Sequence, residues 1–162
     1  MKDQFVWTEV HTTVRNESRI GAIPRLAVVA DFLEEGWPSM DLVAEMLCQE
    51  LKTNYEAVLS GEYVCARYHR RVTRLPGLGG TRFSMNVDRI LNRMWDYPRF
   101  LRRRRTQFDL FHIADHSYSQ LVHALPADRT GVYCHDLDAF RCLLDRARYP
   151  RPRWFRALAR RV

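Results

Sequence analysis

The stretch Phe108–Leu137, FDLFHIADHSYSQLVHALPADRTGVYCHDL, decides the fold of this chain. Phe108–Ala114 is a nearly continuous apolar run, which is typical of a strand buried on both faces of a parallel sheet. Ser117–Leu125 has the apolar spacing of a helix, and Pro126 ends it. Thr130–Cys134 is apolar again, so the stretch predicts a strand, a helix and a second strand in one βαβ unit.

Both predicted strands end in a polar pair. Asp115-His116 follows the first strand, and His135-Asp136 follows the second. Because the carboxyl ends of parallel strands share one edge of a sheet, where ligands bind, these pairs should lie together. The sequence therefore predicts a polar rim made of two histidines and two aspartates.

The chain before this unit begins its own βα pattern. Leu26–Leu33 is the most apolar strand candidate, and we expect it at the centre of the sheet. A loop over residues 34–39 leads to a helix predicted over residues 40–52, with Ser39 as its N-cap. The inward face of this helix is expected to hold Val43, Met46, Leu47 and Leu51.

The next segment carries weaker strand patterns and one clear helix. Short strands are predicted at Tyr55–Ser60 and considered at Val64–Tyr68 and Val72–Leu75. A helix is predicted over residues 85–105, capped by Ser84 and split at Pro98. Its apolar positions are Val87, Ile90, Leu91, Met94 and Trp95.

Strands thus alternate with helices over residues 24–162, after an irregular leader at residues 1–23. The last two predicted helices are Asp138–Arg146 and Trp154–Val162. This alternation predicts an α/β fold with a mostly parallel sheet and helices on both faces. The right-handed crossover rule makes a Rossmann-like sheet the simplest topology.

Composition indicates a folded cytoplasmic protein. The chain has 162 residues, enough for one domain, and its 46% hydrophobic content excludes a disordered chain. It lacks an apolar run long enough to span a membrane, and its polar N-terminus is unlike a signal peptide. Four widely separated cysteines indicate reduced thiols: Cys48, Cys65, Cys134 and Cys142.

The net charge of +7 lies in the C-terminal segment. Residues 141–162 hold eight arginines against Asp145, so residues 1–140 are neutral as a whole. Trp154, Phe155, Leu158 and Val162 share one face of a basic helix. This face would pack on protein outside the chain or lie on an anionic membrane surface. Nucleic acid is disfavoured, because base-stacking aromatics are few.

Four pieces of the sequence together resemble the N-terminal half of the retaining, family-4 (group 1) glycosyltransferases of the GT-B fold. The pieces are Leu26–Met40, Asp96–Leu101, Phe108–Tyr118 and Val132–Leu137. The resemblance implies that residues 24–162 form the acceptor-side domain of an enzyme that moves a sugar from a sugar nucleotide to an acceptor hydroxyl. The acceptor would be a glycan or a lipid-linked molecule.

The same resemblance implies a division of labour between two domains. In the family a second domain binds the sugar nucleotide, and we expect that half to be missing here, leaving a truncated chain that is inactive alone. The sugar nucleotide is a substrate, so no cofactor and no metal are expected. An alternative is a stand-alone Rossmann-like module that binds a nucleotide or a protein.

The resemblance also assigns roles to particular residues. His135 and Asp136 would face the donor sugar, with His135 positioning the reactants rather than acting as a base. Asp115, His116 and Ser117 would line the acceptor pocket. Gly36 and Trp37 lie in the loop that the family places near donor and acceptor. That loop carries one glycine here instead of two, so acceptor contact or loop closure fits as well as phosphate binding.

Structural explanations compete with these roles. Asp115, Ser117 or Asp136 could simply cap helices, and His112 and His123 are expected to be packed histidines. A metal site built from histidines and Asp136 is disfavoured, because the spacings match no ligand signature. Cys134 should point away from His135 and be buried, because adjacent strand residues face opposite sides.

Overall fold

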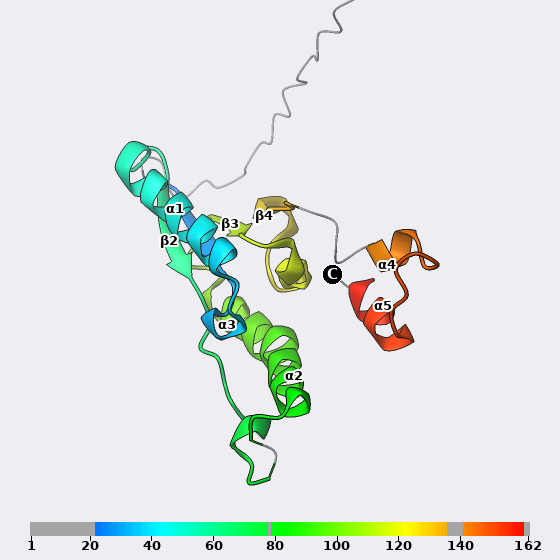
Figure 1. The fold of residues 1–162 in the computed structure, drawn as a ribbon. Coiled ribbons are helices and arrows are strands. Elements are labelled where there is room, and N and C mark those ends of the chain that lie inside the picture. The colour runs from blue at the N-terminus through cyan, green and yellow to red at the C-terminus, as the bar shows by residue number, and fades with distance from the viewer. Residues whose placement is uncertain (1–21, 78, 136–140, 161–162) are drawn as a thin grey trace, which may run out of the picture.

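The computed structural model describes residues 22–77, 79–135 and 141–160, and their core is an α/β fold (Figure 1). Four strands form one all-parallel sheet in the order β2-β1-β3-β4, which confirms the predicted Rossmann-like class. The strands are β1 (Arg25–Val29), β2 (Ser60–Val64), β3 (Leu110–Ile113) and β4 (Thr130–Val132). β1 lies in the interior of the sheet, as its apolar sequence predicted.

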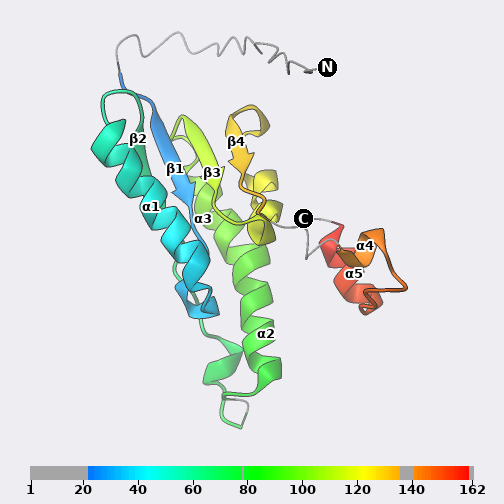
Figure 2. The same cartoon turned by 45° about the horizontal axis from the view of Figure 1, so that its top comes forward.

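Helices connect the strands in chain order (Figures 1 and 2). The connections before β3 are η1 (Leu33–Glu35), α1 (Pro38–Asn54), η2 (Val72–Arg74), α2 (Arg82–Leu91), the π-helical turn η3 (Asn92–Asp96) and α3 (Tyr97–Arg104). Later elements are η4 (His116–Ala124), η5 (Ala127–Arg129), α4 (Arg141–Leu144) and α5 (Arg153–Ala159). No helix among the described residues is long and apolar enough to cross a membrane.

The two faces of β1 pack against different layers. Leu26 and Val28 join Ala44 and Leu51 of α1 in one buried cluster. Ala27 and Val29 belong to the cluster on the other face, under α3 and η4. The alternation of a strand therefore places β1 between two apolar layers, as expected for a parallel sheet.

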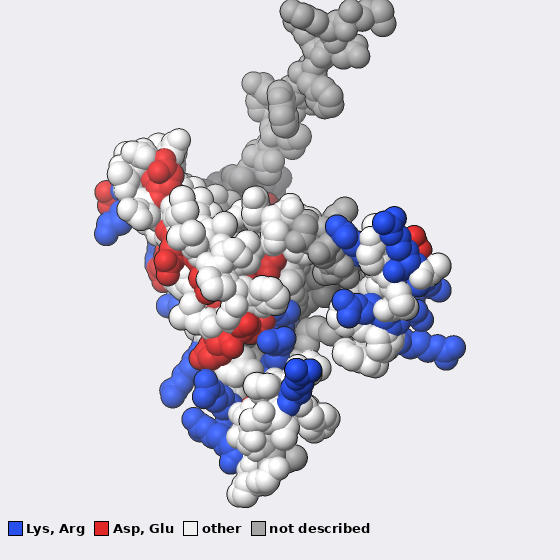
Figure 3. Space-filling model, in the orientation of Figure 1, with Lys and Arg blue, Asp and Glu red and all other residues white. Residues whose placement is uncertain are grey.

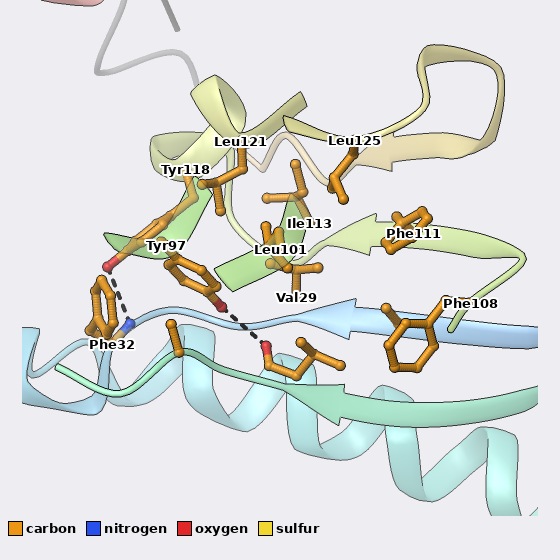
Figure 4. Packing of buried hydrophobic residues seen from close by; sticks show 13 residues of the cluster. Val29, Phe32, Tyr97, Leu101, Phe108, Phe111, Ile113, Tyr118, Leu121 and Leu125 are labelled. Carbon is orange, nitrogen blue, oxygen red and sulfur yellow. Dashed lines mark hydrogen bonds between the residues drawn. The ribbon is translucent and has the colours of Figure 1, made fainter. Parts of the chain in front are cut away.

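Two buried tyrosines connect the second layer to the strand ends. Tyr118 accepts a hydrogen bond at its hydroxyl from Phe32 N, at 3.1 Å, and Tyr97 donates to Val64 O, at 3.0 Å (Figure 4). The Tyr97 hydroxyl also donates to Ala30 O. Backbone N–H and C=O groups just after β1 and at the end of β2 are thus hydrogen-bonded by side chains from η4 and α3.

The Tyr55–Ser60 strand prediction is wrong. Residues 55–59 close the end of α1, with Val58 N and Leu59 N donating to Tyr55 O at 2.8 and 2.9 Å. The strand begins only at Ser60, and Val58 is 68% exposed. Val72–Leu75 is also not a strand: η2 forms there because the Asp88 carboxylate binds successive backbone N–H groups.

The helix predictions are right in position and wrong in details. α1 has Trp37 at its N-cap position with Pro38 in its first turn, so the Ser39 cap is wrong. Met46 is exposed, and Ala44 occupies the inward face instead. Thr81, rather than Ser84, caps α2 by accepting from Ser84 N at 3.1 Å. The predicted split at Pro98 is not a break, because the chain stays helical through the π-helical turn η3 into α3, with Pro98 in the first turn of α3.

Candidate functional site

The carboxyl ends of β1, β3 and β4 meet at one edge of the sheet. Asp115 and His116 follow β3, His135 follows β4, and the two imidazole rings lie 4.7 Å apart between centroids. His135 Nδ1 is 4.0 Å from Asp115 Oδ1. The predicted rim is confirmed for these three residues, and Asp136 lies outside the described residues.

Asp115 is the centre of this rim. It is the N-cap of η4, and its carboxylate accepts from Ser117 N at 3.0 Å and from the Ser117 hydroxyl. His116 Nδ1 lies 3.0 Å from the same carboxylate. Burial alone would raise the pKa of Asp115, but the Ser117 hydrogen bonds outweigh it and hold the pKa below its usual value. Capping and site lining therefore coincide in one ionised residue.

Asp31 is a site residue that sequence reasoning missed. It follows β1 and is 2% exposed, beside Asp115. Burial, and then the charge of Asp115, raise the pKa of Asp31 to about 8. Among the described residues, no group donates a hydrogen bond to either Asp31 oxygen, which suits a carboxyl group with a raised pKa. Its place at the end of the most apolar strand was the signal available in the sequence.

The loop after β1 is held against the site by an ion pair. Glu35 is buried, and Arg93 binds it through Nε, 2.8 Å from Oε1, and through a second contact from Nη2. The Arg93 guanidinium also lies 4.2 Å from the centre of the Tyr118 ring. Gly36 ends this turn with a φ of 69°, a left-handed conformation that suits glycine.

A hollow of about 410 Å³ lies at this edge of the sheet. Five of the seven predicted site residues line it, namely Trp37, Asp115, His116, Ser117 and His135. Gly36 adjoins Trp37 without lining the hollow, and a Cβ there would meet no atom within 4 Å, so the loop is open. Sequence reasoning missed Arg89 and Arg93, which add positive charge from α2 and η3.

Larger hollows lie elsewhere and lack this chemistry. One of about 500 Å³ adjoins Asp109 and Arg129, away from the carboxyl ends of the strands. Another of about 460 Å³ lies beside Tyr68 and Arg70. Neither includes the His–Asp rim, so the smaller hollow is the better candidate for chemistry.

Asp115, His116 and His135 also resemble a metal-ligand set. Their candidate ligand atoms all lie within 4.8 Å of one another, and nitrogen and carboxylate ligands suit zinc. Both Asp115 oxygens, however, already accept hydrogen bonds from Ser117. Asp115 therefore already has partners within the protein, and His112 lies in a different hollow.

Two predictions about neighbouring residues are wrong. Cys134 is exposed rather than buried, because it follows the short edge strand β4 instead of lying within the sheet. His123 is exposed on η4 rather than packed in the core. Neither joins the residues that line the hollow.

Comparison of the chain with protein-family models, with curated proteins and with solved structures gives no match. The arrangement of the site residues therefore carries the functional argument.

Proposed function

We propose that this chain is the acceptor-side domain of a retaining, sugar-nucleotide-dependent glycosyltransferase. One observation carries the proposal: His135, the Asp115–Ser117 turn and Trp37 line one hollow at the carboxyl edge of a parallel sheet. Such an edge is where open α/β sheets bind their ligands. The donor-binding domain would be supplied by further polypeptide, and the expected compartment is the cytoplasm.

The hollow offers the groups that glycosyl transfer needs. Breaking the sugar–phosphate bond creates an oxocarbenium-like sugar and an anionic leaving group, which positioned donors and cations stabilise. Arg89 lines the hollow and is 43% exposed, so its guanidinium can contact a phosphate. The acceptor hydroxyl would attack on the leaving-group side and pass its proton to a phosphate oxygen.

His135 would orient the donor sugar in this reaction. Its ring stands beside the ionised Asp115 and can donate a hydrogen bond to a sugar hydroxyl. Positioning of this kind is worth a large part of a barrier, because it replaces random encounter by a fixed geometry. Trp37 is 53% exposed and provides an aromatic surface against which an acceptor sugar can pack.

Sugar transfer by the complete gene product is the test. Release of nucleoside diphosphate from a panel of sugar nucleotides is measured for the unaltered protein, for His135→Ala and for His123→Ala. His123 is the matched control because it is exposed outside the hollow. We expect His135→Ala to lower kcat/KM by about 100-fold, the usual size of a lost transition-state contact, and His123→Ala to leave it unchanged.

Two results would contradict the proposal. If His135→Ala were as active as the unaltered protein, the hollow would take no part in the reaction. No release from any sugar nucleotide, together with calorimetric binding of a free nucleotide or a protein, would favour the stand-alone binding module.

A further inference from the structure

The helix α2 presents an unusual inward face made of polar residues. Ser84, Asp88 and Asn92 follow one another at four-residue spacing and are all fully buried. Asp88 accepts hydrogen bonds from the backbone N–H groups of residues 71–73, and Asn92 binds both backbone groups of His69. The inward face therefore holds the segment before α2 through hydrogen bonds.

The apolar side chains of α2 and η3 consequently point outward. We define the apolar stripe as Phe83, Val87, Ile90, Leu91, Met94 and Trp95. Phe83 is 67% exposed, Ile90 44% and Trp95 59%. Contiguous exposed apolar residues of this kind mark interaction surfaces.

The segment that carries the stripe is strongly basic. Residues 67–105 contain twelve arginines, no lysine and two acids, for a net charge of +10. Both acids are engaged, as Asp88 is buried and Asp96 pairs with Arg71 at 2.6 Å. Residues 1–66 and 106–140 are acidic, with net charges of −6 and −4, so the neutral balance of residues 1–140 conceals this basic segment.

Arginine and apolar side chains adjoin one another directly. The Arg99 guanidinium lies 5.2 Å from the centre of the Trp95 ring, and Arg71 lines a shallow hollow with Ile90, Leu91 and Trp95. Figure 3 shows basic side chains beside an uncharged surface in the lower part of the molecule, where Figure 1 places α2 and the segment before it.

We propose that the outer surface of residues 67–105 docks on an anionic lipid bilayer. The apolar stripe would enter the boundary between headgroups and acyl chains, and the surrounding arginines would bind lipid phosphates. Amphipathic helices with aromatic and aliphatic side chains on one face and basic residues around it bind membranes in this way. The proposal stands independently of the proposed glycosyl transfer.

Composition and position favour lipid over the other candidate partners. A nucleic-acid surface that stacks bases needs a series of aromatic side chains, whereas the stripe is mainly aliphatic. The surface also adjoins the candidate site, because Arg89 and Arg93 reach the hollow from α2 and η3 themselves. Docking would therefore bring the hollow close to lipid-linked molecules.

Vesicle co-sedimentation of the full chain tests the proposal. The probes are vesicles of phosphatidylcholine alone and vesicles of phosphatidylcholine mixed with phosphatidylglycerol. We expect binding to the mixed vesicles and at least about tenfold weaker binding of Ile90→Glu and Arg99→Glu, because each contact near an anionic surface contributes on the order of a tenfold change. Circular dichroism checks that the variants are folded.

Matched controls separate this surface from others. Val58→Glu, just beyond α1, matches Ile90→Glu, and Lys52→Glu, at the end of α1, matches Arg99→Glu. Both control positions are exposed, and both variants should bind normally. Trp154→Glu tests the basic C-terminal helix, where Trp154 is 63% exposed, and it should also retain binding. The proposal is overturned if Ile90→Glu binds like the unaltered protein, if only Trp154→Glu loses binding, or if the chain binds RNA and ignores vesicles.

Discussion

At the scale of the residue, the fold raises the pKa of Asp31 far enough for a stability measurement to detect the shift. Burial, followed by the charge of Asp115, raises its pKa from 3.8 to about 8, while Arg93 opposes and Glu35 adds to the shift. Between these two pH values the folded chain binds more protons than the unfolded chain. The contribution of Asp31 to stability is therefore present at low pH and is lost as the pH rises toward 8.

Asp31→Asn should remove this dependence, because an amide keeps the shape and does not ionise. From about pH 5 to about pH 8, the free energy of unfolding of the unaltered protein should fall relative to that of Asp31→Asn by more than about 1 kcal/mol, since one proton contributes up to about 1.4 kcal/mol per pH unit. Urea unfolding at both pH values measures the difference. Parallel pH curves for the two proteins would contradict the assignment.

Two strand glycines provide a paired test of packing. A Cβ on Gly61 would lie 2.6 Å from Leu51 Cδ1 and 3.2 Å from Leu51 Cβ, and Leu51 is buried under β2. A Cβ on Gly131 would meet only His112 Nδ1, at 3.8 Å. Gly61→Ala should therefore cost about 1–3 kcal/mol, while Gly131→Ala should be nearly neutral. Equal melting temperatures of the two variants would disprove the predicted clash.

At the scale of the element, α2 is stabilised by the polar residues of its inward face. Although burial opposes ionisation of Asp88, hydrogen bonds from the Thr73 hydroxyl and from the N–H groups of residues 71–73 lower its pKa to about 2. The stabilising effect of Asp88 should persist to acid pH and be lost only as the pH falls toward 2.

Asp88→Ala should destabilise the protein by about 2–4 kcal/mol, because several buried N–H groups lose their acceptor. Asp96→Ala is the matched control, since Asp96 contacts the same segment through a half-exposed ion pair with Arg71. Exposed pairs contribute little, so this change should cost less than about 1 kcal/mol. Chemical denaturation of both variants compares them, and similar losses would rule out the special role of Asp88.

The predictability of each element follows from where its stabilising contacts lie. β1 and β3 were recognisable within the apolar runs Leu26–Leu33 and Phe108–Ala114 because both strands are buried on their two faces, although the strands end earlier, at Val29 and Ile113. The α2 helix was recognisable from its spacing, but its orientation was not. Its inward face depends on hydrogen bonds to residues 69–73, a contact that no helical period encodes.

At the scale of the whole molecule, the Glu35–Arg93 pair joins three segments. Arg93 of η3 binds Glu35 of η1 and approaches Ser117 O of η4 at 3.4 Å. Arg93→Ala would leave the buried Glu35 facing only Arg89, at 3.6 Å, and should cost about 3–5 kcal/mol. Arg89→Ala should cost less than about 1 kcal/mol, because Arg89 is 43% exposed.

Thermal unfolding of these two arginine variants measures the difference. If Arg89→Ala lost as much stability as Arg93→Ala, total positive charge near Glu35, rather than the buried Glu35–Arg93 pair, would determine stability. Hydrogen exchange adds a local reading, since residues 33–37 should exchange faster in Arg93→Ala only.

Part of the candidate site could likewise be predicted from the sequence, and part could not. The rim formed by Asp115, His116 and His135 was predictable, because parallel strands deliver their carboxyl ends to one edge. Asp31 and Arg93 were not found, because their partners come from distant segments, 58 residues apart for Arg93 and Glu35.

The sequence by itself determined the class of the fold, the central place of β1 and the edge on which polar residues gather. These features follow from apolar periodicity and from the direction of parallel strands, which are local properties of the chain. Only the tertiary structure decided that Asp31 is buried beside Asp115, that Arg93 holds the loop of Glu35, and that the apolar stripe of α2 faces outward. Each of these depends on which distant groups satisfy a buried charge or N–H, and that choice exists only once the chain is packed.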